Sequence, residues 1–213
     1  MHPRERLDKA NIKLGKELMV VKSSLDTYRV IGLNASRITR GKVFFGHAQG
    51  LSLVHVALGL AKVFEREREE RPKLCSISGI YRLAKEVEIR APAVANTFAR
   101  KYGVQACGNW IQDVQVVFAN QEPVFRRHLG EVYRVRHTRI AHLQQDAPSG
   151  NLPSIDAFEK LLAFAVDFRF FVNDAFLDTS SHPILQDGTL CASLTAVLKD
   201  TGVSDVVSDF QDL

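Results

Sequence analysis

The feature that most constrains the fold is the spacing of apolar residues near the start of the chain. Between residues 7 and 28 they recur in steps of three and four, or in multiples of those steps. The stripe consists of Leu7, Leu14, Leu18, Val21, Leu25 and Tyr28. Such a period places all of them on one side of an α-helix, and that side must be buried against other elements. The pattern predicts a long helix of the kind found in helical bundles.

A second apolar segment follows at residues 43–70 and is apolar on nearly every side as far as Phe64. A helix with this composition is expected to be surrounded by other helices, so we predict that it is the central element. Gly46 and Gly50 lie one turn apart in it and predict a closely packed neighbour. His47 is interpreted as a core histidine with its hydrogen bonds satisfied, and so is His55.

The middle of the chain predicts shorter elements. A short helix is expected over residues 76–88, and a second one opens at Pro92 and ends near Gly103. The run "NWIQDVQVVF" that follows is too short for its periodicity to distinguish a helix from a strand. No pattern of a parallel sheet and no glycine-rich phosphate loop is present. The chain is predicted to be all-α.

Two long helices are predicted after this run. Asn120 and Pro123 give the start signal of the first, which should reach about Gln145 before "APSGNLPS" ends it. Ser154 caps the second, whose buried stripe is rich in aromatic residues. Together with the first helices they predict a helical domain over residues 1–177.

The last part of the chain differs in charge from the rest. Residues 178–213 hold six Asp and one Lys, a net charge of −5, whereas the whole chain carries +4. A single helix is expected within residues 184–200. We predict a basic helical domain followed by a partly helical acidic extension over residues 178–213.

Composition narrows the cellular setting and the chemistry. The three cysteines form no C-x-x-C pair, so neither a disulfide framework nor a thiolate zinc site is indicated. The N-terminus is charged where a signal peptide is apolar, and the driest stretch, residues 51–64, is interpreted as too short to span a bilayer. We expect a cytoplasmic protein with no membrane partner.

One charge interrupts the apolar stripe of the helix predicted from Pro123. Arg136 lies within about 20° of the centre of that stripe on an ideal helix. Burying a lone guanidinium costs several kcal/mol, so it must be paired, lie in an interface, or face a cleft that holds an anion. The apolar members of the stripe are Phe125, Leu129, Val132, Ile140 and Leu143.

Further basic groups lie beside this stripe. His128, Arg139 and His142 fall along one shoulder of the same helix. Arg136 and His142, however, are about 120° apart with about 9 Å of rise between them, so a single helix does not make a compact site. Two copies related by a twofold axis can bring the arginine of one to the histidine of the other. The sequence therefore predicts a homodimer in which this stripe faces the partner.

The stretch "RHTRIAH", residues 136–142, resembles the motif of the HEPN superfamily, in which an Arg and a His are separated by four to six residues. Here five residues intervene, and His137 holds the polar first place. The wider order of elements is similar to the AbiU-type branch of HEPN proteins from bacterial abortive-infection systems. It includes the apolar second helix, the short "SISGIYRLAKEVE" helix and the aromatic-rich last helix, and so covers roughly residues 1–177.

The resemblance implies an up-and-down helical bundle with short extra helices, which forms a homodimer and cuts RNA without a metal. In that reading Arg136 holds the scissile phosphate and His142 moves the proton between the ribose 2′-hydroxyl and the leaving oxygen. The product would be a 2′,3′-cyclic phosphate. His137 would support the site, and Arg139 would contact a second phosphate.

Two more residues complete the predicted site. His128 lies on the same shoulder as Arg139 and is assigned to RNA binding. Asp146 lies four residues after His142 and is expected to orient its imidazole, although the same pair is also the one place on this helix where a metal is conceivable. We otherwise expect no metal and no cofactor.

Two other readings remain open at the level of sequence. The first is a HEPN-type module that binds RNA, a nucleotide or a protein without cutting, with an antitoxin or a nucleotidyltransferase as its partner. The second is a plain helical interaction protein. Cleavage of RNA in the presence of EDTA separates the catalytic reading from both.

Overall fold

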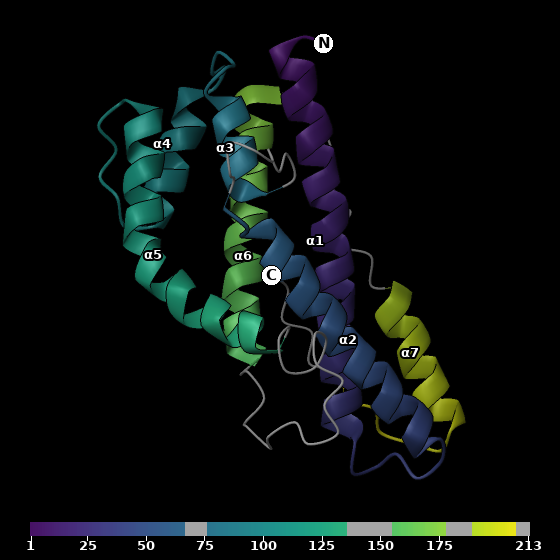
Figure 1. Ribbon diagram of the computed structural model, residues 1–213. Helices are drawn as coiled ribbons and strands as arrows, with labels where there is room; N and C mark the ends of the chain where they lie inside the picture. Colours follow the sequence, from purple (N-terminus) through teal and green to yellow (C-terminus); the bar gives the residue numbers. More distant parts are fainter. Residues whose placement is uncertain (67–75, 136–154, 178–188, 208–213) are drawn as a thin grey trace.

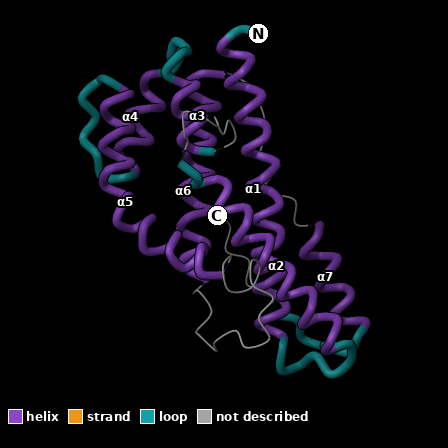
Figure 2. Tube along the Cα trace, in the orientation of Figure 1, coloured by secondary structure: helices purple, strands orange, loops and turns teal. Residues whose placement is uncertain are grey.

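The computed structural model describes residues 1–66, 76–135, 155–177 and 189–207, and every regular element in these ranges is a helix (Figures 1 and 2). The all-α prediction is confirmed at this level. The elements, in chain order, are α1 (Pro3–Asn34), α2 (Lys42–Val63), α3 (Ile77–Ala84), α4 (Pro92–Lys101), α5 (Trp110–Val135), α6 (Ile155–Val172), the π-helix η2 (Asn173–Leu177) and α7 (Thr189–Asp200).

Helix α1 forms as its apolar spacing predicts. It begins at Pro3, whose missing N–H costs nothing in the first turn, and the side chain of His2 accepts a hydrogen bond from the backbone N–H of Arg4 at 3.3 Å. The predicted stripe is buried from Leu7 to Leu25, and Tyr28 is partly buried against the same core. This long helix therefore supplies one wall of the main hydrophobic core.

Helix α6 lies between α1 on one side and α4 and α5 on the other (Figure 1). It is aromatic-rich, as predicted, and Phe158 and Phe168 are completely buried. The π-helix η2 continues it, and the carbonyl of Ala175 accepts hydrogen bonds from the N–H groups of Arg90 at 2.8 Å and Ala91 at 3.2 Å. These bonds hold the start of α4 against η2, which continues α6.

Helix α5 begins earlier than the sequence predicts. It starts at Trp110, because the Asn109 side chain accepts hydrogen bonds from the N–H groups of Ile111 at 3.1 Å and Gln112 at 3.4 Å. Pro123 lies inside the helix and is not its start. A proline within a helix removes one backbone hydrogen bond and bends the axis, and α5 changes direction along its length (Figure 1).

Helix α2 is not surrounded, and the prediction that it is the central element is wrong. It packs mainly on α1, while one side of it faces solvent. His47 and His55 are exposed and are not core histidines. A Cβ atom added to Gly46 or Gly50 would meet nothing within 4 Å, so no neighbour in the described protein explains these two glycines.

The length of α2 also bears on the membrane prediction. The helix has 22 residues and a mean hydropathy of 1.4 over its driest window, which is long and apolar enough to cross a bilayer by these two measures alone. Within the protein, 39% of that window is buried. The same measures are met by core helices of proteins outside membranes.

The acidic extension docks on the body of the protein. Helix α7 lies within the predicted 184–200 segment, and Leu198 and Val203 are buried in a small second core beside the end of α1. Asn34 of α1 donates to the carbonyl of Val207 and accepts from its N–H, both at 3.1 Å. The described part of the extension is therefore held by packing and by two hydrogen bonds between the Asn34 side chain and the Val207 backbone.

Candidate functional site

Most of the predicted site lies outside the described residues. The description of α5 ends at Val135, one residue before the motif, and resumes at Ile155. The predicted arrangement of the motif side chains therefore stays a prediction. The residues concerned are Arg136, His137, Arg139, His142 and Asp146.

The apolar stripe of α5 is described as far as Val135. Val132 and Val135 are 0% and 3% exposed and belong to the main core. Phe125 is half-buried, and its ring meets that of Phe164 on α6 at 4.5 Å between centroids. The protein's own helices therefore cover Val132 and Val135, and the prediction that the stripe faces a twofold partner stays a prediction.

Next to this stripe lies a groove of about 730 Å³ between the end of α2 and the second half of α5. Its apolar floor includes Phe64, Phe125 and Leu129, and Tyr133 lies near its end. Gly130 also lines it, and no atom occupies the place where a Cβ would project. The groove follows α5 to within two residues of Val135, which directly precedes the motif.

The rim of the groove carries two arginines and two carboxylates, Glu65 and Glu122. Arg126 contacts Glu122 at 2.7 Å, and Arg66 approaches the same carboxylate oxygen at 3.6 Å. The two guanidinium side chains are 79% and 86% exposed. The formal charges of these four side chains balance, so the rim offers an anion two exposed guanidinium groups and no net positive charge.

These arginines were not predicted from the sequence. Arg126 follows Glu122 by four residues, a spacing usually explained as an exposed ion pair. Arg66 belongs to the charged run after α2, which looks like a solvated helix end. Arg66, which follows α2, and Arg126, on α5, both approach Glu122, and this shared partner brings them to the rim of one groove.

His128 is the one predicted site residue that the structure describes. Its side chain is buried, at 8% exposure, and its Nδ1 atom is buried without a hydrogen-bond partner in the described protein. The Asp156 carboxyl, at the start of α6, has a lowered pKa, first because the Lys160 side chain hydrogen-bonds to it. His128 and Arg127 lie near enough to add to this lowering. Contact between His128 and RNA stays a prediction, and the imidazole would reach RNA only through an opening of this helix pair.

A different arginine is deeply buried. Arg169 on α6 is 2% exposed, and an added Cβ at Gly15 of α1 would lie 2.5 Å from its Nε atom. Burial lowers the pKa of Arg169, and the nearby Asp174 carboxylate acts in the opposite direction. Arg169 was not predicted from the sequence, because it stands within an aromatic run and the space for it is left by Gly15 on α1, far away along the chain.

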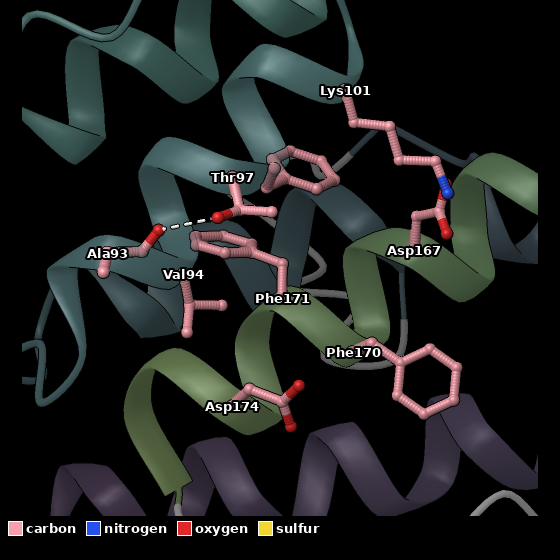
Figure 3. A pocket seen from close by; sticks show the side chains of 9 residues that line it. Ala93, Val94, Thr97, Lys101, Asp167, Phe170, Phe171 and Asp174 are labelled. Atoms are coloured by element: carbon pink, nitrogen blue, oxygen red, sulfur yellow. Dashed lines mark hydrogen bonds and ion pairs between the residues drawn. The ribbon is translucent and has the colours of Figure 1, made fainter.

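A second concavity, of about 360 Å³, lies between α4 and α6 (Figure 3). Phe98 and Phe171 stack in it with centroids 4.8 Å apart, and the Lys101 ammonium lies 2.7 Å from Asp167. The Tyr102 hydroxyl donates to the same carboxylate at 2.6 Å. Burial, aided by Asp167, raises the pKa of Tyr102. Lys101, Tyr102 and Asp167 thus bind one another, while the exposed Asp174 carboxylate, which also lines the concavity, accepts a hydrogen bond from the Asn173 side chain at 3.0 Å.

No metal-binding group of three or more His, Cys, Asp or Glu side chains occurs among the residues that the structure describes. Comparison with protein-family models, with curated proteins and with solved structures finds no match for this chain. Its function is therefore inferred from its own residues.

Proposed function

We propose that this protein is a metal-independent endoribonuclease of the HEPN type, with a catalytic site shared by two copies of the chain. The observation that carries the proposal is the groove along α5, about 730 Å³ in volume, which is lined as far as Tyr133, three residues before Arg136 in the sequence, and has two exposed arginines on its rim. An open groove with exposed guanidinium groups suits an RNA backbone, because arginine binds phosphate oxygens in a bidentate manner.

The reaction requires one proton acceptor, one proton donor and a group that stabilises the phosphate. His142 takes the proton of the ribose 2′-hydroxyl as the 2′-oxygen attacks phosphorus, and the bond to the 5′-oxygen breaks. The leaving oxygen receives a proton from an imidazole, and the products are a 2′,3′-cyclic phosphate and a 5′-hydroxyl. Arg136 stabilises the negative charge that develops on the phosphate oxygens.

The remaining predicted residues have supporting roles. Asp146 orients the imidazole of His142, and His137 supports the site from the polar place of the motif. Arg139 contacts a neighbouring phosphate. Arg66 and Arg126 extend this phosphate contact along the groove, from the rim that the structure describes.

The proposal is tested by incubating the full-length protein with total RNA in EDTA. The wild type should release fragments with 2′,3′-cyclic phosphate ends, and Arg136→Ala and His142→Ala should each lower the rate at least about 100-fold, as expected for loss of a phosphate-stabilising or proton-transfer group. His2→Asn is the matched control, because Asn can also cap α1. A wild type that binds RNA without cutting it would replace the enzyme with the non-catalytic binding module.

A further inference from the structure

One side of α2 is apolar and is not covered by the part of the chain that the structure describes. Four of its side chains stand out as exposed large apolar groups: Val43 at 89%, Phe44 at 67%, Leu51 at 47% and Leu58 at 39%. A contiguous exposed apolar patch of a few hundred Å² usually marks an interaction surface. The glycines at the edge of this side, Gly46 and Gly50, leave open space above the helix backbone.

The spacing of these residues indicates what kind of element covers them. Phe44, Leu51 and Leu58 are separated by seven residues each, and His47 and His55 lie four residues before and after Leu51 on the same side of the helix. A seven-residue apolar repeat is the repeat of helices that pack along their length in a coiled-coil manner. We refer to Phe44, His47, Leu51, His55 and Leu58 as the α2 seam.

The α2 seam is symmetric about its centre. Leu51 lies midway between Phe44 and Leu58, and also midway between His47 and His55. In an antiparallel pair of identical helices, Leu51 would therefore meet its own copy. Phe44 would meet Leu58, and each His47 would meet a His55. A twofold interface needs this kind of self-complementary surface, in which like chemistry meets like at every position.

Charge also selects the antiparallel orientation. The first turn of α2 holds Lys42 and no acidic residue. The positive charge of Lys42 therefore lies at the positive end of the helix dipole, which is unfavourable. An antiparallel copy brings its carboxyl-terminal end, which carries the negative end of the dipole, beside Lys42. At that end Lys62 is already paired with Glu17 of α1. A parallel copy would instead place the two Lys42 side chains together.

We propose that a second copy of this chain covers the α2 seam, with the two α2 helices antiparallel and Leu51 at the twofold axis. The proposal does not rest on the ribonuclease activity, since the seam pairs the chains whether or not the pair cuts RNA. A helix of 22 residues is about 33 Å long and about 10 Å wide, so the seam is smaller than the roughly 800 Å² per partner of a standard interface. The dimer should therefore dissociate in the micromolar range.

Sedimentation velocity of the full-length chain tests the pairing. The wild type should change from monomer to dimer as its concentration rises through the micromolar range. Leu51→Glu should raise the dissociation constant about 100-fold or more, because it places two carboxylates against each other at the axis. Val116→Glu on α5 is the matched control, since Val116 is 45% exposed and Leu51 is 47% exposed. This control should dimerise like the wild type.

Circular dichroism of the two variants should give the same helix content and melting temperature, which separates loss of pairing from loss of folding. A wild type that stays monomeric overturns the proposal, and so does a Leu51→Glu variant that dimerises as well as the wild type. Co-sedimentation with phosphatidylcholine–phosphatidylglycerol vesicles that Leu51→Glu abolishes would also overturn it, and would assign the seam to a membrane surface.

Disulfide trapping tests the register, in a chain whose Cys75, Cys107 and Cys191 are replaced by Ser. Leu51→Cys should crosslink to itself on mild oxidation. Phe44→Cys alone should not crosslink, but it should do so when mixed with Leu58→Cys. Self-crosslinking of Phe44→Cys at the same rate as Leu51→Cys would indicate parallel helices and would overturn the antiparallel pairing.

Discussion

Helices α2 and α6 are both apolar around most of their circumference, yet they sit in the protein in different ways. Helix α6 contacts α1, α2, α4 and α5, and both Phe158 and Phe168 are fully buried. Helix α2 buries one side, with Leu60 and Val56 at 0% exposure, and leaves Phe44 at 67%. An apolar helix is therefore enclosed either by its own chain or by something outside it, and composition alone does not say which.

The largest expected effect is on the enclosed helix. Phe168→Ala should lower the free energy of unfolding by about 3–5 kcal/mol, because it leaves a cavity in the centre of the aromatic core. Phe44→Ala removes the same side chain from the exposed side of α2 and should change the monomer by no more than about 0.5 kcal/mol. Urea unfolding at submicromolar concentration measures both. Equal losses would contradict the comparison.

The two sides of α2 itself give the next prediction. A Cβ at Gly59 would lie 2.3 Å from the Cγ2 atom of Val21, so Gly59→Ala should destabilise the protein by about 1–3 kcal/mol through overpacking against α1. Adding Val21→Ala should recover part of this loss, because the double variant restores the space. A Gly59→Ala variant as stable as the wild type would show that α1 and α2 are not packed this closely.

The packing of α6 against α4 includes an ionisable group. Burial raises the pKa of Tyr102, whose neutral hydroxyl donates a hydrogen bond to Asp167. The contribution of this hydroxyl to the free energy of unfolding is therefore complete below pH 10, and it is lost as the pH rises through the raised pKa of Tyr102. Tyr102→Phe should cost about 1 kcal/mol at pH 7. The wild type should lose this advantage over Tyr102→Phe at strongly alkaline pH. Thermal melts of both proteins from pH 7 to pH 11 check this, and a difference that grows with pH would contradict it.

The smallest effect should come from the open edge of α2. Gly50→Ala should stabilise the monomer by about 0.5 kcal/mol, because alanine favours the helix and its Cβ meets nothing within 4 Å. Gly46→Ala should act in the same direction. Chemical unfolding at submicromolar concentration is the relevant measurement, since it excludes effects of pairing. A loss of stability would mean that another part of the protein covers this edge.

The long helices were predictable because a period of three and four residues is a local property of the chain. Their surroundings were not predictable, since the exposed side of α2 and the buried Arg169 depend on which helix lies opposite. The start of α5 was misplaced for a related reason. The Asn109 cap and the Pro123 signal compete within one sequence, and the cap begins the helix while the proline is tolerated inside it.

The candidate site was predictable only in part. The motif from Arg136 to His142 was read from its spacing, but the groove along α5 depends on Arg66, which follows α2, and on Arg126 of α5, which meet at Glu122. No local spacing reports such a meeting. The seven-residue repeat of the α2 seam is present in the sequence, but the helix was predicted to be surrounded because its apolar character extends around it.

The most direct test of the central claim mixes two inactive chains. If two copies share one site, Arg136→Ala and His142→Ala subunits should each fail to cut RNA in EDTA but together restore about a quarter of the wild-type activity, since about half of the dimers are mixed and each mixed dimer holds one intact site. A mixture as inactive as its separate components, or a wild type that cuts no RNA, would contradict the account.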